Sequence, residues 1–327
     1  MNEPPSEADS ATLEGIILRP SDLAFPSTAE MLFGRGGGFA LEIGFGNGDF
    51  LCRLAADHPE RNVIGADTSP SSVIRAYRRI SRRGLTNAKV FAGTGEFVVR
   101  NVIPDGALER VYVNFPDPWP RRRHHGRRLL SAEFLELLAC RLGDQGTVLL
   151  TTDHEDYYRF ACAAAKKSGF FDRDEHPAPA GTLRTRWAQR WLDAGCTIYH
   201  AQFRKTRRPD TPAPRLTLTG MQHSLLRGSL DAITDFEKFV LKRDGVNIVV
   251  SEAHRQIGEK AVIFPTIVEE NDLRQFVLIE AHPRGDEVLV GVKRFGQPLS
   301  TPGVNMAVTA VADYLAGVGL EILERTY

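Results

Sequence analysis

Two hydrophobic periods alternate along the first two thirds of the chain. Short apolar runs, typical of buried strands, are followed by segments in which apolar residues recur every three to four positions, as they do in helices. The strand-like segments are 39–46, 62–69, 88–93, 110–119, 146–157 and 198–205, and the helical segments are 49–59, 70–84, 95–102, 131–143 and 158–171. Strands that alternate with helices form parallel sheets with right-handed crossovers. Residues 39–206 are therefore predicted to form one doubly wound, Rossmann-like α/β domain.

The pattern changes after residue 206. Residues 207–215 combine proline and arginine without an apolar period, which is typical of an exposed linker. Beyond the linker, the strand-like segments are 246–254, 260–270, 273–283 and 286–295, and one helical segment follows at 306–323. A small α+β domain is therefore expected over residues 216–327. Residues 1–38 are interpreted as an N-terminal tail and lead-in, of which residues 1–12 are expected to be disordered.

Composition and charge narrow the class of protein. From Asp210 to the end there are 12 Lys and Arg against 16 Asp and Glu, and since the whole chain has 41 of each, residues 1–209 hold the remaining 29 and 25. This basic N-terminal part weakly favours a polyanionic partner. The four cysteines lack metal-ligand spacing, and no stretch reaches the roughly 18 apolar residues of a membrane helix. We therefore expect a cytoplasmic protein with no metal and no membrane partner.

A glycine-rich turn follows the first predicted strand. Gly44, Gly46 and Gly48 occupy alternate positions where the chain leaves the strand and enters the next helix, so the backbone can bend sharply and approach a ligand. The dinucleotide fingerprint GxGxxG has a different spacing, and here an acid, Glu42, precedes the first glycine. A carboxylate at this turn suits a cationic ligand such as S-adenosylmethionine, which carries an ammonium and a sulfonium.

A second acid supports the same ligand. Asp67 ends the next strand, 19 residues after Gly48, where a carboxylate can accept hydrogen bonds from both hydroxyls of a ribose. The alternative is that the glycines only make a tight turn and that Asp67 caps the following helix. The agreement of two independent spacings favours binding of S-adenosylmethionine.

The segment NFPDPWPRRRHHGRRL at 114–129 has two contrasting halves. Three prolines in five residues stiffen the first half and hold Asp117 and Trp119 at the carboxyl end of the sheet, where ligands of open α/β folds bind. The second half is a cationic run that contains Arg121, Arg122, Arg123, His124, His125, Arg127 and Arg128. Such a run is often only a solvated surface, but arginine forks match phosphate oxygens. Beside a stiff acidic and aromatic loop, we expect it to hold an RNA backbone.

Four motifs together resemble a known family. Through LEIGFGNG, NFPDPWPRRRHHGRRL, TTDHEDY and YHAQFRK, residues 30–206 closely resemble the bacterial tRNA (guanine-N7)-methyltransferases. The resemblance implies a Rossmann-like class I methyltransferase fold with S-adenosylmethionine as cofactor. It also implies methyl transfer to N7 of a guanine in the variable loop of tRNA, at position 46 in tRNA numbering.

The resemblance also implies roles for individual residues. The cofactor contacts that it implies, taken with the glycine turn, are Glu42, Gly44, Gly46, Gly48, Asp67, Thr94 and Asp117. The residues implied to approach the target guanine are Arg121, where the family usually has lysine, Asp153 and Thr185, with Asp117 and Asp153 as the catalytic carboxylates. The residues implied to hold the RNA backbone are Arg122, Arg123, His124, Arg127 and Arg128.

Two positions depart from the family pattern. The family's Gly-Asp-Ala before the fourth strand corresponds here to residues 93–95, so the hydroxyl of Thr94 replaces a carboxylate that binds adenine. A hydroxyl can still form this hydrogen bond, but the bond is weaker than one to a charged group. The family's late Thr-x-(Phe/Tyr)-Glu element matches residues 185–188, where Ala188 replaces the glutamate. These departures leave open a non-catalytic RNA-binding module descended from a methyltransferase.

Other functions and other residue roles fit the sequence less well. An enzyme that acts on small molecules or proteins would leave the arginine run without a purpose. His58 and His154 have no paired nucleophile, so surface or core roles are favoured over acid–base chemistry. In the C-terminal domain, Phe276, Phe295 and Lys293 could contact RNA, but a role in building the core is favoured. We expect a monomer.

Overall fold

The computed structural model divides the chain into two compact units. It describes residues 15–174, 176–177, 180–184, 186–193, 195–211, 213–270 and 273–326. The division falls between Arg215 and Leu216, and the two parts are called here the N-terminal and the C-terminal unit. The expected disorder of residues 1–12 concerns a segment outside the described residues. In the part of the chain that is described, no helix has the length and apolar character needed to cross a membrane.

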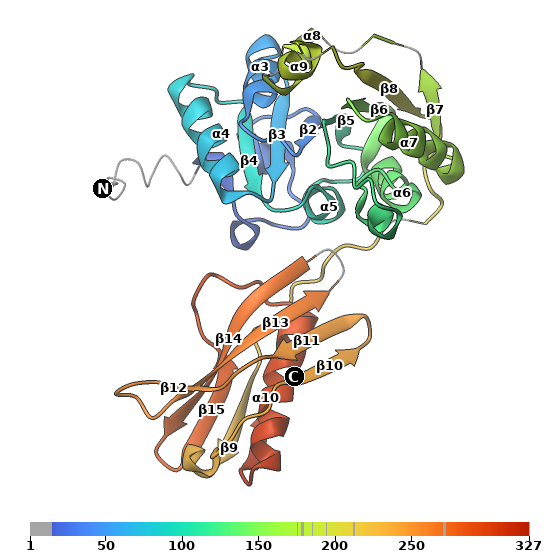
Figure 1. Cartoon of the computed structure of the whole chain (residues 1–327). Helices are drawn as coiled ribbons and strands as arrows, with labels where there is room; N and C mark the ends of the chain where they lie inside the picture. The colour runs from blue at the N-terminus through green and yellow to red at the C-terminus, as the bar shows by residue number, and fades with distance from the viewer. Residues whose placement is uncertain are drawn as a thin grey trace. The chain divides into compact units, whose positions relative to one another are not determined.

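An eight-stranded mixed sheet forms the centre of the N-terminal unit (Figure 1). Its strands are β1 (Ile17–Leu18), β2 (Phe39–Ile43), β3 (Asn62–Asp67), β4 (Ala88–Ala92), β5 (Leu108–Asn114), β6 (Leu142–Thr152), β7 (Phe171–Asp174) and β8 (Tyr199–Lys205), in the spatial order β1-β4-β3-β2-β5-β6-β8-β7. All pairs from β1 to β6 are parallel, whereas β8 pairs antiparallel with both β6 and β7. The predicted doubly wound α/β domain is confirmed, with a mixed sheet instead of a purely parallel one.

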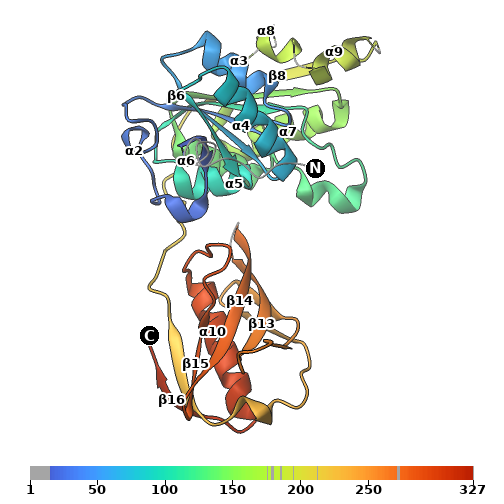
Figure 2. The same ribbon diagram turned by 90° about the vertical axis from the view of Figure 1, so that its left-hand side faces the viewer.

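Helices cover both faces of this sheet (Figures 1 and 2). They are α2 (Ala29–Phe33), α3 (Asp49–Asp57), α4 (Pro70–Arg82), α5 (Gly95–Phe97), α6 (Ala132–Arg141), α7 (Glu155–Ser168), α8 (Ala180–Leu183) and α9 (Arg186–Asp193), with short turns η1 (Pro20–Asp22), η2 (Val98–Val102) and η3 (Arg122–Arg127). Alternate residues of a strand point to opposite faces, so Ala40 packs in one core with Leu51 of α3 and Ala76 of α4. On the other face, the ring of Phe91 stacks on Phe97 of α5.

Some elements escaped the sequence pattern because they are short. In the lead-in, β1 adds to the sheet beside β4, and the Thr28 side chain caps α2 by accepting a hydrogen bond from the amide of Met31. At the other end of the sheet, β7 has only four residues. Two or three apolar side chains cannot establish a period, so such elements are set by tertiary pairing.

The C-terminal unit is an antiparallel half-barrel around one helix. Its elements are β9 (His223–Arg227), η4 (Leu230–Ala232), β10 (Phe239–Arg243), β11 (Val246–Val250), β12 (His254–Arg255), β13 (Val262–Glu270), β14 (Leu273–Arg284), β15 (Glu287–Val292), α10 (Pro302–Gly317) and β16 (Glu321–Arg325). The strand order is β10-β11-β13-β14-β15-β9-β16, with β12 beside β13. Buried and half-buried residues alternate strictly along β13, so one face of the strand packs toward α10. This helix contributes Val304, Val308 and Val311 to the core. The expected α+β fold is confirmed.

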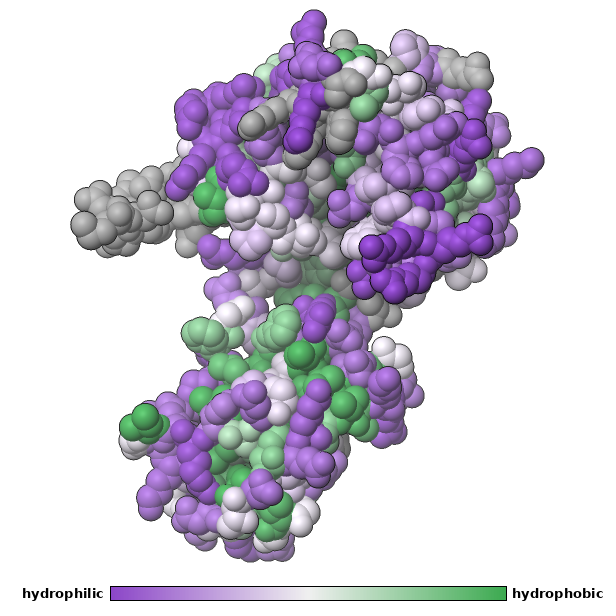
Figure 3. Space-filling model, viewed as in Figure 1, coloured by the Kyte–Doolittle hydropathy of each residue, from purple (hydrophilic) through white to green (hydrophobic). Residues whose placement is uncertain are grey.

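Two expectations for this unit are wrong. The helix predicted over 306–323 ends at Gly317, because Gly319 adopts a left-handed φ of 109° that turns the chain into β16. Phe276 and Phe295 do not build the core, since they are 73% and 70% exposed. Figure 3 shows hydrophobic side chains on the surface of this unit.

The end of the N-terminal unit is held by one carboxylate. Arg141 is fully buried, and its Nη1 lies 2.7 Å from Oδ1 of Asp105. The same Oδ1 lies 2.7 Å from Nη2 of Arg215. The other carboxylate oxygen of Asp105, Oδ2, lies 2.7 Å from Nη2 of Arg208. Burial lowers the pKa of Arg141 to about 10. Arg141 also donates to the carbonyl oxygen of Ala213 at 3.0 Å. The segment expected to be a free linker is therefore tied to the N-terminal unit up to Arg215.

We expect Asp105→Ala to lower the free energy of unfolding by about 3 kcal/mol, the lower end for a broken buried ion pair because Asp105 is partly exposed. The cause is that Arg141 stays buried without its carboxylate. Urea unfolding followed by circular dichroism measures the change. Glu155→Ala is the control, since it removes an exposed i,i+4 pair with Arg159 and costs about 0.5 kcal/mol or less. Equal effects of the two variants would contradict the account of Asp105.

Candidate active site

The carboxyl ends of the parallel strands surround a cavity of about 370 Å³. Because β2, β3, β4 and β5 are parallel, the loops that follow them all emerge at one edge of the sheet. The residues that line the cavity are Ile43, Gly44, Ala66, Asp67, Thr68, Gly93, Thr94, Gly95, Glu96, Asn114, Phe115, Pro116, Asp117, Trp119, Arg127 and Leu129. The glycine turn and the proline-stiffened loop, 70 residues apart in sequence, thus contribute to one site.

The glycine turn has a backbone that other residues rarely adopt. Gly44, Gly46 and Gly48 have φ of 76°, 57° and 76°, all in the left-handed region. A Cβ added at Gly48 would lie 2.8 Å from the Cβ of Ala76, so the close approach of α3 and α4 requires glycine there. At Gly44 and Gly46, no atom of the described residues other than the chain neighbours lies within 4 Å of an added Cβ. Gly48 therefore serves helix packing, whereas Gly44 and Gly46 leave space beside the backbone.

Asp67 links the glycine turn to the start of α4. Its Oδ2 accepts a hydrogen bond from the amide of Gly46 at 2.8 Å, and its Oδ1 accepts one from the amide of Ser69, also at 2.8 Å. The cap of α4 is Ser69, whose hydroxyl accepts from the amide of Ser72. Asp67 is thus held by two backbone amides at the wall of the cavity, with its remaining lone pairs available to a ligand.

Glu42 lies behind the cavity wall. The side chain is buried, and burial raises its pKa to about 8. Its Oε1 accepts a hydrogen bond from Nδ2 of Asn114 at 3.2 Å, and its Oε2 is buried without a hydrogen-bond partner among the described residues. Asn114 lines the cavity and Glu42 does not. Sequence reasoning missed Asn114, because only the parallel pairing of β2 and β5 brings it beside Glu42.

Thr94 caps α5 in the wall of the cavity. Its Oγ1 accepts a hydrogen bond from the amide of Phe97 at 3.1 Å. The hydroxyl proton stays available as a donor, whereas a carboxylate at this position would only accept. The replacement of the family's aspartate thus changes the polarity of the hydrogen bond that this position can offer a ligand.

The proline-stiffened loop is held in an uncommon conformation. Phe115 and Trp119 have positive φ of 52° and 43°, which bulky residues rarely adopt and which marks strain. The amide of Phe115 donates to the carbonyl oxygen of Thr151 in β6 at 2.7 Å. Asp117 is exposed and Trp119 half-buried, and both line the cavity. The sequence placed Trp119 at this edge of the sheet but indicated no contact for it, although its position between two prolines was a signal.

Arg128 is the residue that fastens this loop. It is only 5% exposed, and its Nε donates to the carbonyl oxygen of Pro118 at 2.9 Å. Its guanidinium lies over the rings of Tyr157 and Phe160, with its Cζ 5.7 and 5.0 Å from their centroids. This burial fits a positioning role in place of the expected contact with an RNA backbone.

The other arginines of the run face solvent. The exposed ones are Arg121, Arg122, Arg123 and Arg127, while His124 and His125 are half-buried. The Cζ of Arg127 lies 5.0 Å from the centroid of the Trp119 ring, and the imidazole of His124 meets the same ring edge-on at 5.8 Å. The ring of Trp119 and the guanidinium of Arg127 therefore both line the cavity, and three further exposed arginines lie between them in the sequence.

The remaining candidates lie near this edge or outside the described residues. Asp153 is half-buried directly after β6, next to the proline-stiffened loop in the sheet order, but it does not line the cavity. His154 caps α7, where its Nδ1 accepts from the amide of Tyr157 at 3.3 Å. Thr185 lies outside the described residues, and Ala188 is buried in α9.

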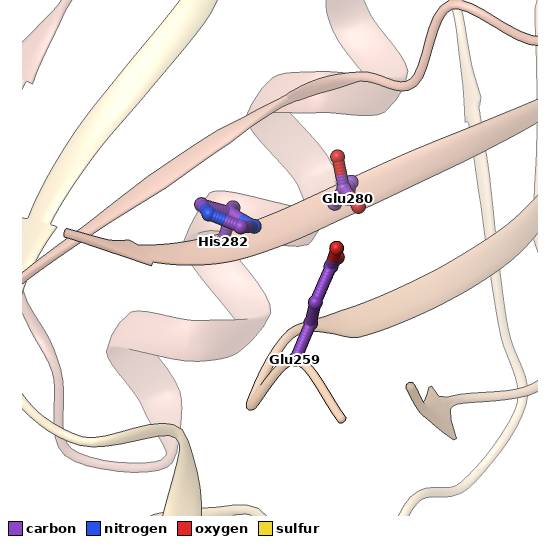
Figure 4. A group of neighbouring side chains, drawn as sticks. All are labelled: Glu259, Glu280 and His282. Carbon is purple, nitrogen blue, oxygen red and sulfur yellow. The ribbon is translucent and has the colours of Figure 1, made fainter. Parts of the chain in front are cut away.

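A group of possible metal ligands occurs in the C-terminal unit. Glu259, Glu280 and His282 bring one ligand atom each within 4.8 Å of one another (Figure 4). However, Oε1 of Glu280 accepts from Nζ of Lys293 at 2.6 Å. Because an ammonium already neutralises this carboxylate, we do not assign a metal site to the group.

The raised pKa of Glu42 predicts a pH-dependent stability. Below its ordinary pKa of 4.5 the carboxyl is protonated in both states; between pH 4.5 and 8 the unfolded chain loses the proton and the folded chain keeps it. The free energy of unfolding therefore falls as the pH rises through this window. Thermal melting should show Glu42→Gln gaining stability over the parent at pH 8 but not at pH 5. Glu109→Gln, at an exposed acid, is the control. Parallel pH profiles of Glu42→Gln and the parent would contradict the assignment.

Comparisons with known proteins agree with this arrangement. A family model described as putative methyltransferase matches residues 38–201. The chain is 42% identical to the tRNA (guanine-N(7)-)-methyltransferase of Thermus thermophilus, with 92% of this chain and 96% of that protein covered. The protein of the same name from Deinococcus radiodurans is 36% identical, with 95% and 100% covered, and that of Thermotoga maritima is 28% identical, with 92% and 97% covered.

Solved structures show a weaker likeness. The 16S rRNA methyltransferase KamB has a TM-score of 0.40 and 16% identity, with 63% of this chain and 96% of that chain covered. The relatives, in contrast, match the chain over both units at substantial identity. The chain belongs to the family of S-adenosylmethionine-dependent tRNA (guanine-N7)-methyltransferases.

Proposed function

We propose that this chain methylates N7 of a guanine in tRNA, at position 46 of the variable loop, within the cavity at the carboxyl edge of the N-terminal unit. The observation that carries the proposal is the meeting of three features at this cavity: an open glycine turn, a strained aromatic and acidic loop, and exposed arginines. All of them come from one chain, so we propose that a monomer holds a complete site. The substrate places the reaction in the cytoplasm.

The residues of the cavity fit S-adenosylmethionine. Gly44 and Gly46 leave open space beside their backbone, and Asp67 offers free lone pairs to ribose hydroxyls. Oε2 of Glu42 is a buried acceptor without a partner among the described residues, so a nearby ammonium would be attracted to it and would favour its ionised form. Asn114 lies between Glu42 and the cavity and would transmit this contact. When bound, the cofactor supplies an electrophilic methyl group on its sulfonium.

The target atom sets the demands on the chain. N7 of guanine carries no proton and presents a lone pair, so its alkylation requires no general base. The side chains must therefore align the guanine with the cofactor and stabilise the positive charge that develops on the base. This requirement matches a site whose described lining offers carboxylates and an aromatic ring and contains no histidine.

The carboxylates would identify the base. A carboxylate at Asp153 or Asp117 can accept hydrogen bonds from N1–H and N2–H of guanine, which adenine cannot provide. The same negative charge would stabilise the methylated, cationic base. Trp119 offers a ring face at the cavity, on which an unpaired base can stack, and Arg127 now covers that face. The guanidinium would move to a phosphate when the base enters.

The exposed arginines would position the RNA. Arg121, Arg122 and Arg123 are exposed in the segment between Trp119 and Arg127, which both line the cavity, and can fork onto phosphate oxygens. Arg121 directly follows the proline-stiffened loop in the sequence, so we propose that it lies beside the guanine. Arg128 would act indirectly, by holding the carbonyl oxygen of Pro118 and hence the loop.

Replacing N7 of the target base should abolish the reaction. We expect a tRNA transcript with 7-deazaguanine at position 46 to accept no methyl group, because its C7–H has no lone pair, while its binding changes little. The transcript with guanine is the control, and transfer of labelled methyl is the measurement. Equal transfer to both transcripts would sink the proposal, since another atom or position would then be the acceptor.

Removal of the Asp153 carboxylate should affect turnover more than cofactor binding. We expect Asp153→Ala to lower kcat by about 100-fold or more, as loss of a charge-stabilising group does, and to change the Kd for S-adenosylmethionine by less than about threefold. Asp156→Ala, at an exposed acid in the first turn of α7, is the matched control. Equal losses of turnover and of cofactor affinity would show that Asp153 acts on the cofactor.

A further inference from the structure

Five arginines form a stripe along one flank of α4. They are Arg75, Arg78, Arg79, Arg82 and Arg83, the last of which caps the helix. The spacing i, i+3, i+4, i+7, i+8 places them on one side of a helix, and at 1.5 Å per residue the stripe is about 12 Å long. The buried side of α4 is separate and contains Ser72, Val73, Ala76 and Ile80.

The charge of this stripe is only partly neutralised. Arg79 pairs with Asp49 of α3, and Nη2 of Arg75 donates to the hydroxyl of Ser72 at 3.1 Å. Arg78, Arg82 and Arg83 are exposed and have no carboxylate within 4.0 Å in the ranges that the structure describes. The helix itself contains no acid. Cations at the C-terminal end of a helix, such as Arg82 and Arg83, are favoured by the helix dipole. Like charges at i,i+4 destabilise a helix, so helix stability does not explain five arginines on one side, whereas a bound polyanion would relieve their repulsion.

The stripe begins beside the candidate active site. Arg75 and Arg79 line a cavity of about 1030 Å³ that extends to Gly46 and Asn47 of the glycine turn. The residues of α9 that line the same cavity are Gln189, Arg190 and Asp193. The cavity thus connects the cofactor turn with a surface that carries three cations and one acid.

The stripe and the arginine run flank the glycine turn. In the sheet, β3 lies on one side of β2 and β5 on the other; α4 follows β3, and the run at 121–128 follows β5. From the carboxyl edge, α4 leads back along the side of the unit, and Figure 3 shows hydrophilic side chains gathered over the side where Figure 1 places α4. A nucleic acid that enters the cavity can therefore meet cations on both sides.

We propose that the arginine stripe of α4 is a second phosphate-binding surface, which holds the tRNA backbone on the opposite side of the cofactor turn from Arg121–Arg127. This inference rests on the proposed function, because tRNA is taken as the polyanion. The phosphates of an RNA strand form a regular row of charges, which a regular row of arginines matches without reading sequence. The surface therefore contributes affinity and register, and the bases are read in the cavity.

The test removes the three exposed charges. In the full chain, Arg78→Gln, Arg82→Gln and Arg83→Gln combined should raise the Kd and KM for unmodified tRNA by about tenfold or more, and should lower the slope of log affinity against log salt by about one per lost phosphate contact. The kcat at saturating tRNA and the Kd for S-adenosylmethionine should stay unchanged. The melting temperature should change little, because the removed like-charge repulsion offsets the lost interaction of Arg82 and Arg83 with the helix dipole.

A matched triple variant provides the control. Arg110→Gln, Lys166→Gln and Lys167→Gln combined also remove three exposed charges, but near the amino edge of the sheet, where β5 begins and α7 ends. If both triple variants bind tRNA with the same affinity and salt slope, the stripe is not an RNA surface. If the α4 triple variant binds polyglutamate more weakly than the parent does but binds tRNA equally well, the stripe would instead serve an acidic protein partner, and the proposal would be overturned. A parent protein that methylates no tRNA would contradict the proposed function itself, which the variants do not decide.

Discussion

The parallel pairing of β2 with β3 and with β5 is the constraint on which the site depends. It places the glycine turn between the end of β3, which carries Asp67, and the end of β5, which carries Asn114 and the proline-stiffened loop. The same pairing brings Asn114 to Glu42 across the sheet. A register shift in either pair would separate these groups, because each contributes through its position at one edge. The chemistry of the site is thus an outcome of sheet topology.

The buried and the exposed arginines have different roles. Arg128 and Arg141 are buried and donate to carbonyl oxygens, Arg141 also to the carboxylate of Asp105, and each fixes a segment: the loop at Pro118 in one case and the end of the unit in the other. Arg121, Arg122 and Arg123 of the run and Arg78, Arg82 and Arg83 of α4 are exposed, and we propose that they receive phosphates. A guanidinium has five donors in a rigid fork, so the same side chain can staple a backbone or receive a phosphate.

Much of the N-terminal unit could be predicted from sequence, because its strands and helices are long and strongly periodic. The glycine turn, Asp67 and the loop with Asp117 lie together as expected, since parallel strands end at one edge. The burial of Arg128 could not be predicted, because Tyr157 and Phe160 come from a distant helix. The position of Glu42 behind Asn114 could not be predicted either, because the two residues are far apart in the sequence and meet only through the pairing of β2 with β5. In the C-terminal unit, apolar residues of β16 continued the helical period of α10, and only Gly319 marked the break.

The most direct test of the account is transfer of labelled methyl from S-adenosylmethionine to unmodified tRNA, followed by mapping of the labelled atom. We predict label at N7 of the guanine at position 46 in the variable loop. Label at another atom, or no transfer by a protein that binds the cofactor, would contradict it.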